Sequence, residues 1–158
     1  MKKINAFPYI GGKFNSVEWL LPLLPKCNTY VEPFGGGMSI LLNREPSPVE
    51  VYNDLNNKIV NLFKVLRKNP LEFLSLIYLT PYAREEYNTC YNKEYAPNKD
   101  SDIERARRTL VLINQSIMAR GLRGRKAGWG YTIAADHSSQ SLKWNNIITR
   151  IMPSSNIL

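Results

Sequence analysis

The sequence predicts an α/β fold, and three observations lead to this expectation. Residues 29–34 are a short run with the pattern of a buried strand, and it enters a glycine cluster at residues 35–37. Residues 49–52 are a second short run with strand-like composition. Between the two runs, residues 38–43 can begin a helix, and strands joined by a helical crossover pair in parallel with a right-handed connection. The first third of the chain is therefore expected to contain a βαβ unit.

A helix is expected directly after the second strand and is predicted to close at residues 68–70. Its apolar residues recur at spacings of four, three and four, as one helix face requires: Leu55, Ile59, Leu62 and Leu66. Nearer the N-terminus, Asn15 and Glu18 have the spacing of a helix start, and Pro22 is expected to kink or shorten that helix. The apolar surface of this first helix is expected to comprise Val17, Trp19, Leu20, Leu23 and Leu24.

Residues 70–92 have a helical pattern rich in tyrosine. Their expected packing residues are Leu71, Leu74, Ile77, Tyr78, Tyr82, Tyr87 and Tyr91. After a polar loop at residues 93–100, Ser101 and Glu104 form a capping box for the next helix, whose arginines are expected to face away from its apolar stripe. That stripe comprises Ile103, Ala106, Leu110, Ile113 and Ile117.

The last part of the chain combines a glycine-rich segment with a return to helical spacing. Residues 121–131 mix glycine, basic and aromatic residues, which suits a mobile loop or a hairpin better than a packed element. Residues 141–151 are expected to form a helix that Pro153 ends. The apolar side of this helix comprises Trp144, Ile147, Ile148 and Ile151.

Length and composition exclude several classes of protein. With 158 residues, 44% of them apolar, the chain suits one globular domain or a large part of one. Cys27 and Cys90 lie far apart and His137 is the single histidine, so neither a disulfide scaffold nor an ordinary metal site is expected. The first residues are too polar for a signal peptide, and no run approaches the roughly 18 apolar residues of a membrane span. We expect a cytoplasmic protein with no membrane partner.

The formal charge of +8 is concentrated in one short segment. Residues 1–102 are almost balanced, whereas residues 103–128 carry seven basic residues against Glu104 alone. Such a cluster attracts polyanions, and duplex nucleic acid is the commonest partner of this kind. A solvated helix face followed by a basic loop is the alternative explanation.

The glycine cluster and an acidic residue further on suggest a site for an adenosine-containing cofactor. A glycine turn between a strand and a helix brings a ligand close to bare backbone, and an acidic residue about 20 positions later binds ribose hydroxyls. Gly35 and Asp54 have this relation, but Ile40 stands where a dinucleotide motif has its third glycine. A simple tight turn and a nicotinamide-binding site are the alternatives.

Three segments together resemble one family, the Dam-like, alpha-class adenine-specific DNA methyltransferases: Phe7-Pro8-Tyr9-Ile10-Gly11-Gly12-Lys13, Tyr30-Val31-Glu32-Pro33-Phe34-Gly35-Gly36-Gly37-Met38-Ser39 and Val51-Tyr52-Asn53-Asp54-Leu55-Asn56. The resemblance implies a partial Rossmann-like fold that binds S-adenosylmethionine and carries a mostly helical DNA target-recognition insertion. By this resemblance, residues 1–69 are the cofactor-binding part, residues 70–140 the recognition region and residues 141–158 a return to the core. The implied activity is methyl transfer to the adenine amine in double-stranded DNA, in DNA methylation of the restriction-modification or phage type.

The resemblance also implies roles for individual residues. The cofactor-binding set comprises Tyr9, Lys13, Glu32, Phe34, Gly35, Gly37 and Asp54, and the DNA-binding set comprises Arg120, Arg123, Arg125 and Lys126. Each role has a structural alternative: Tyr9 as a core aromatic, Lys13 as a surface lysine, Glu32 as a carboxylate bonded to loop amides and Asp54 as a helix N-cap. Trp129 or Tyr131 would stack on a base or fill the gap left by a flipped one, and Trp129 suits core packing equally well.

The family's Asp-Pro-Pro-Tyr motif does not occur in the 158 residues, so no catalytic residue is assigned. Thr80-Pro81-Tyr82 is the nearest match, and it lacks both the acidic acceptor and the second proline. The sequence therefore looks like the N-terminal portion of such an enzyme. Three explanations stay open at this point: a truncated gene product, a split methyltransferase whose second chain supplies the motif, and a non-catalytic DNA-binding remnant.

Overall fold

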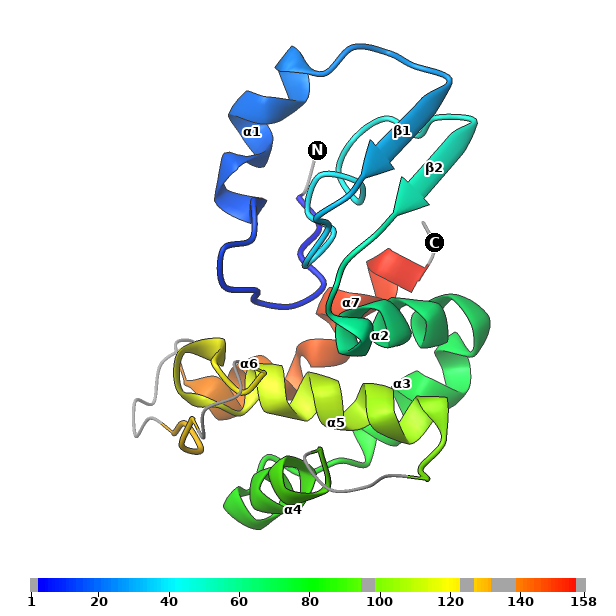
Figure 1. Cartoon of the computed structure of the whole chain (residues 1–158). Helices are drawn as coiled ribbons and strands as arrows, with labels where there is room; N and C mark the ends of the chain where they lie inside the picture. Colours follow the sequence, from blue (N-terminus) through cyan, green and yellow to red (C-terminus); the bar gives the residue numbers. More distant parts are fainter. Residues whose placement is uncertain (1–2, 95–98, 123–126, 132–138, 156–158) are drawn as a thin grey trace.

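The computed structural model describes residues 3–94, 99–122, 127–131 and 139–155. A small parallel sheet and its connecting loops lie on one side, and a group of packed helices lies on the other (Figure 1). The elements in chain order are η1 (Phe14–Ser16), α1 (Val17–Leu20), η2 (Leu21–Leu23), β1 (Thr29–Glu32), β2 (Val49–Tyr52), α2 (Asn57–Lys68), α3 (Pro70–Tyr78), α4 (Arg84–Glu94), α5 (Asp102–Asn114), η3 (Ile117–Ala119), α6 (Gln140–Asn145) and α7 (Ile147–Ser155).

The two predicted strands are confirmed and pair in parallel. Thr29 lies opposite Val49 and Glu32 opposite Tyr52, so both strands end at the same edge of the sheet. The prediction of a helix beginning at residues 38–43 is wrong, because this crossover consists of turns. Met38 has φ +57°, a left-handed conformation that a helix cannot continue through, although Leu42 N–H still donates to Met38 O at 3.0 Å.

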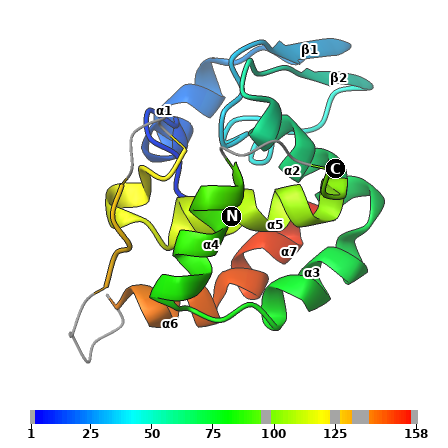
Figure 2. The same cartoon turned by 60° about the horizontal axis from the view of Figure 1, so that its bottom comes forward.

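The helices pack around one apolar core. α5 lies between α2 and α4, and α3 packs against α7 (Figures 1 and 2). The predicted inner face of α2 is confirmed at Ile59, Leu62 and Leu66, all fully buried. Leu55 does not join it and is 90% exposed, because the helix begins only after Asn56, whose side chain accepts a hydrogen bond from Lys58 N–H. The core extends from Ala6 to Ile151, so it unites the predicted cofactor-binding and helical regions.

Several amphipathic expectations near the surface are wrong. Pro22 lies in the 3₁₀ turn η2, which limits α1 to a single turn and leaves Trp19 and Leu23 exposed. Leu71 and Tyr78, predicted to pack, are also exposed on α3. A helix as short as α1 buries only one of its sides, and apolar spacing over four residues does not determine which side that is. In α3 the buried side is formed by Phe73, Leu74 and Ile77, so Leu71 and Tyr78 are left on the exposed side.

The C-terminal helix differs from its prediction in two ways. It divides at Asn146 into α6 and α7, with Trp144, Ile147 and Ile151 buried as expected. Pro153 does not end the helix but lies inside α7. A proline this close to a helix end removes one backbone hydrogen bond and leaves only the final residues to accommodate its ring.

Candidate functional site

The loops that follow β1 and β2 meet beyond the carboxyl edge of the sheet. Gly35 N–H donates to Asn53 O at 2.9 Å, and Asn53 N–H donates to Glu32 O at 3.0 Å. The side chain of Asn53 adds a third link, donating to Pro33 O at 2.9 Å. In open α/β sheets, ligands bind at this edge, outside the carboxyl ends of the strands. The two loops thus form one unit at the edge where a ligand is expected.

Asp54 holds the glycine loop and the start of α2 together. One carboxylate oxygen accepts from Gly36 N–H and the other from Asn56 N–H, both at 2.8 Å. The N-cap of α2 is Asn56, so the N-cap alternative for Asp54 does not describe its position. Each carboxylate oxygen has a second lone pair, so Asp54 keeps the capacity to accept hydrogen bonds from two further hydroxyls.

Two tyrosine rings enclose the glycine cluster. A Cβ on Gly35 would overlap the ring of Tyr52, and a Cβ on Gly36, at φ +50°, would lie 2.8 Å from Cε1 of Tyr9. The Tyr52 hydroxyl also donates to Gly36 O at 2.8 Å, and burial raises the pKa of Tyr52, which keeps that proton in place. Tyr52 is a positioning residue that the sequence motifs alone did not single out. Its location at a strand end, two residues before Asp54, is the signal that points to it.

Glu32 and Lys13 form the charged part of this site. Glu32 is almost fully buried at the end of β1, and its carboxylate accepts from Leu41 N–H at 3.1 Å. Burial raises the pKa of this carboxyl, while the Leu41 amide and the charge of Lys13 oppose the rise. The structure therefore shows the loop-amide role of Glu32 and places the exposed Lys13 close enough to act on it electrostatically.

The structure brings the predicted cofactor residues together at one edge of the molecule. Tyr9 packs on Gly36 and Gly37, and Phe34 extends into solvent with 75% of its surface exposed. Phe34 thus presents an open aromatic face next to Gly35. The described part of the chain has no group of three His, Cys, Asp or Glu side chains arranged to hold a metal ion.

The basic segment has a different structure from the one its charge suggests. Arg107 bonds Glu104 at 2.8 Å and also Glu86, and Arg108 is fully buried against Asp100. The prediction that the arginines of this helix all face away from its apolar stripe is therefore wrong. The ion pairs allow Arg107 to lie against α4 and Arg108 to be buried beside the segment before α5, because a paired charge costs far less to bury than an isolated one.

Among the predicted DNA-binding residues, Arg120 is described and lies exposed after η3. Arg123, Arg125 and Lys126 lie outside the described residues. Nearby, Ser116 and Trp129 form an antiparallel bridge, which agrees with the hairpin alternative for this segment. The Trp129 ring stacks on Tyr131 with centroids 5.5 Å apart and contacts Tyr82 at 5.4 Å, so Trp129 packs against neighbouring aromatics.

Among the described residues, none of the helices combines the length and the apolar character that a membrane span requires. The candidate site is therefore the cluster of loops at the carboxyl edge of the sheet. Asp54, Glu32 and the glycines at residues 35–37 line it.

Comparison with known proteins gives consistent results. The family described as D12 class N6 adenine-specific DNA methyltransferase matches residues 9–145. The chain is 30% identical over 121 residues to the Type II methyltransferase M1.LlaDCHI of Lactococcus lactis subsp. cremoris, a match covering 70% of this chain and 42% of that protein. It is 35% identical over 77 residues to a DNA adenine methylase of Vibrio cholerae, covering 47% and 27% of the two chains. A DNA adenine methylase of Salmonella typhi is 31% identical over 102 residues, covering 57% and 36%. The chain thus spans less than half the length of these relatives.

Proposed function

The chain belongs to the D12 class of N6 adenine-specific DNA methyltransferases, and we propose on this basis that its site binds S-adenosylmethionine for methyl transfer to the adenine amine of DNA. The proposal includes a Rossmann-like arrangement of the sheet, of which β1 and β2 are the part that the structure describes. It also includes the division into a cofactor-binding part (1–69), a recognition region (70–140) and a return to the core (141–158).

The observation that carries the proposal is the position of Asp54. Its carboxylate lies between the glycine loop and the start of α2, where it already orients Gly36 N–H. A carboxylate at the end of the second strand is placed to accept the two ribose hydroxyls of a nucleoside. The glycines let the rings of Tyr52 and Tyr9 pack directly against the backbone of residues 35–37, and this packing holds the loop beside Asp54.

The remaining residues suit the other parts of the cofactor. Tyr9 and Lys13 lie on the N-terminal side of the loop and would border the methionine part. Glu32, held by Leu41 N–H, would act on the methionine ammonium or fix the loop. The exposed ring of Phe34 offers a surface on which a purine can stack. Gly35 and Gly37 would permit close approach.

DNA contact would come from the segment after α5. Arg120 is exposed, and we propose that it contacts phosphate oxygens together with Arg123, Arg125 and Lys126. Arginine suits this role because its planar fork binds phosphate through two parallel hydrogen bonds.

Methyl transfer to adenine also requires groups that accept the two hydrogens of the exocyclic amine. The amine is a weak nucleophile, and positioned acceptors favour the geometry needed to attack the sulfonium methyl. The Asp-Pro-Pro-Tyr segment that carries these acceptors in the family is not among the 158 residues. We therefore propose that turnover needs this segment in addition to the residues present here.

The basic segment after α5, where Arg120 is exposed, supports a second candidate function. In this alternative the chain is a DNA-binding subunit of a split methyltransferase or a non-catalytic remnant. Both functions predict DNA binding, and they differ in whether the Asp54 site accepts the methyl donor.

Calorimetric titration with S-adenosylmethionine tests the proposal without requiring turnover. We expect micromolar binding by the chain and a loss of at least about tenfold in Asp54→Ala, because ribose hydroxyls lose a charged acceptor worth roughly 1.5–3 kcal/mol. Asp54→Asn retains one carbonyl oxygen and should give an intermediate affinity. Asp102→Asn, in the first turn of α5, is the matched control and should bind like the unchanged protein.

Circular dichroism must first show that each variant is folded, since Asp54 also holds Gly36 and Asn56. A folded chain that binds no S-adenosylmethionine would refute the cofactor proposal and leave the DNA-binding alternative. Binding of a nicotinamide dinucleotide in place of the methyl donor would assign the glycine loop to a different cofactor.

A further inference from the structure

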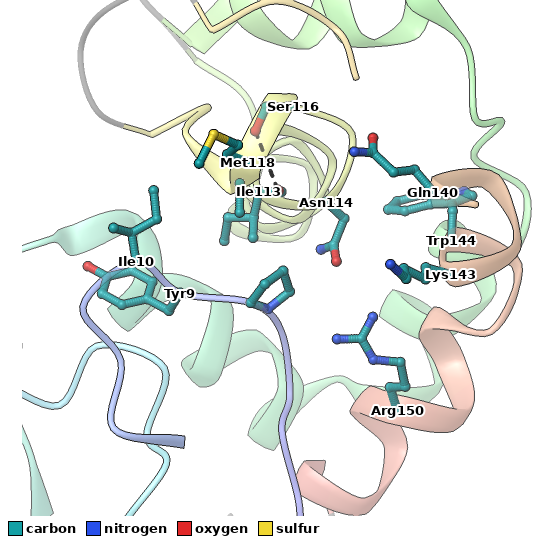
Figure 3. A pocket seen from close by; sticks show the side chains of 12 residues that line it. Tyr9, Ile10, Ile113, Asn114, Ser116, Met118, Gln140, Lys143, Trp144 and Arg150 are labelled. Atoms are coloured by element: carbon teal, nitrogen blue, oxygen red, sulfur yellow. Dashed lines mark hydrogen bonds between the residues drawn. The ribbon is translucent and has the colours of Figure 1, made fainter. Parts of the chain in front are cut away.

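A pocket of about 580 Å³ lies between the N-terminal loop and the helical part of the molecule. Its walls come from Pro8 to Ile10, the end of α5, the turn η3, and helices α6 and α7. Figure 3 shows Lys143 and Arg150 pointing into the same space toward Asn114, with Tyr9 and Ile10 on the other side. Pockets of this size hold small organic ligands, and a nucleotide falls within the range.

The polar groups of this pocket carry a net positive charge. Lys143 and Arg150 are its charged residues, and no acidic side chain of the described residues lines it. Asn114 and Gln140 add neutral amides, and the rest of the lining is largely apolar. A cationic, partly apolar cavity suits a ligand that has both an anionic group and a flat or apolar part.

Arg150 differs from the other sheltered arginines of the described chain. Arg44, Arg107 and Arg108 are each paired with a carboxylate, namely Glu50, Glu104 or Asp100. Within the described ranges no ion pair is found for Arg150, although burial lowers the pKa of its guanidinium. An arginine stays charged in proteins, so the guanidinium of Arg150 gives the pocket a cationic group that no carboxylate of the described residues neutralises.

The pocket also adjoins the candidate cofactor site. Tyr9 lines the pocket and packs on Gly36 and Gly37 of the glycine loop. A flat ligand in the pocket would therefore lie against the same aromatic residue as the proposed cofactor. The exposed side chain of Met118, in the turn η3, also lines the pocket.

We propose that this pocket binds one nucleotide of the DNA substrate, with its phosphate held by Arg150 and Lys143 and its base directed toward Tyr9. The inference rests on the proposed function, because it identifies the anion as DNA phosphate. Arg150 and Lys143 are positioning residues in this arrangement. An enzyme that acts on a base must take it out of the duplex, and holding the adjacent phosphate fixes the displaced nucleotide beside the reaction centre.

Salt dependence of DNA binding gives a readout specific to a phosphate contact. The probe is a fluorescent duplex with one unpaired adenine, titrated with the whole chain at several salt concentrations. Each lost phosphate contact reduces the slope of log K against log salt by about 0.9. We expect this reduction in Arg150→Gln, together with roughly tenfold weaker binding, whereas Arg150→Lys should keep most of the slope and lose part of the affinity.

Arg67→Gln is the matched control, because Arg67 is an exposed arginine of α2, a helix that does not line the pocket. It should leave the slope unchanged. A second probe replaces the phosphate beside the unpaired adenine with a neutral methylphosphonate. The unchanged protein should lose affinity for this probe, and Arg150→Gln should lose little more, because both changes remove the same contact.

Three results would overturn the inference. The first is a folded Arg150→Gln variant that keeps its affinity for the duplex and its salt slope. The second is an unchanged chain that does not bind the duplex. The third is an unchanged chain that binds the phosphate and methylphosphonate probes with equal affinity. Competition by inorganic phosphate at millimolar concentration, as strong as competition by unlabelled duplex, would instead assign a small-anion site. Titration with S-adenosylmethionine separates the two proposals. Arg150→Gln should still bind the cofactor, because Arg150 is not part of the cofactor site. If the unchanged chain does not bind S-adenosylmethionine, the cofactor proposal alone is refuted.

Discussion

The glycine loop and the arginine-rich helix α5 neutralise their charged side chains in opposite ways. At the loop, backbone amides donate to the carboxylates of Asp54 and Glu32, and these contacts lie within a few residues of the motifs. At α5, carboxylates from other segments bind Arg107 and Arg108. A sequence motif therefore identifies the charged residues of the loop correctly. A count of the arginines in α5, in contrast, overstates the positive charge that is available to a binding partner.

The same contrast separates two kinds of arginine. Arg107 and Arg108 join α5 to α4 and to the segment before α5, so their charges contribute to the fold. Arg120 and Arg150 have no carboxylate partner within the described residues, so their charges remain available for a ligand. The chain carries a net charge of +8, but only part of it is placed to attract the DNA that we propose as its substrate.

The largest expected effect comes from removing a buried arginine. We predict that Arg108→Ala lowers the free energy of unfolding by about 3 kcal/mol, because it leaves a cavity and removes the partner of Asp100. Urea unfolding followed by circular dichroism measures this loss. If Arg108 lay on a solvated helix face, which was the alternative from the sequence, Arg108→Ala would leave the free energy of unfolding almost unchanged.

Arg105→Ala is the control for this prediction, since Arg105 lies three residues away on the exposed side of α5 and pairs only at the surface. It should have a much smaller effect, because exposed ion pairs contribute little. Equal losses in the two variants would show that position in the helix, and not burial of the guanidinium, sets the stability.

Local spacing predicted the parts of the fold that depend on local contacts. The strands at residues 29–32 and 49–52, the buried face of α2, and the cap of α5, where Ser101 accepts from Glu104 N–H, all follow from neighbouring residues. Met38 shows the limit. Its left-handed backbone allows the glycine loop to pack against Tyr9 and Tyr52, a tertiary requirement that helix propensity does not contain.

The sequence predicted the part of the candidate site that lies in local motifs, and it did not predict the part that tertiary packing assembles. The spacing of a glycine turn and a later acidic residue selects Gly35 and Asp54, and the resemblance to the family's motifs adds Tyr9 and Glu32. The pocket residues Asn114, Lys143 and Arg150 come from three different helices and share no motif. Only the packing of α5, α6 and α7 places them together.

A smaller effect is expected from the glycine loop. Gly35→Ala places a methyl group against the ring of Tyr52, and we predict a loss of about 2 kcal/mol of stability together with weaker binding of S-adenosylmethionine. Thermal unfolding and calorimetry measure the two quantities. The double variant Gly35→Ala with Tyr52→Ala tests the cause, because removal of the ring should make the alanine nearly neutral. Additive losses would mean that the ring contact is not what excludes a side chain here.

The smallest expected effects come from protonation of Glu86 and Glu32, whose pKa values are shifted in opposite directions. Burial raises the pKa of Glu86, but hydrogen bonds from Arg107 and Cys90 outweigh it and lower the pKa below the ordinary value of 4.5. Its ion pair thus stabilises the fold above pH 4.5, and this contribution is lost as the pH falls through the lowered pKa. We predict that Glu86→Gln is most destabilising near neutral pH and that its effect shrinks in acid.

Glu32 should show the reverse dependence. Burial raises its pKa above 4.5, so folding takes up a proton between 4.5 and the raised pKa, and the unfolding free energy falls as the pH rises through that window. Relative to the unchanged protein, Glu32→Gln should therefore gain stability with rising pH, since its amide keeps an oxygen for Leu41 N–H without a buried charge. Urea unfolding of both variants between about pH 3 and pH 7 measures the two slopes. Slopes of the same sign would contradict the contrast, because they would mean that Lys13 compensates the buried charge of Glu32 as fully as Arg107 compensates Glu86.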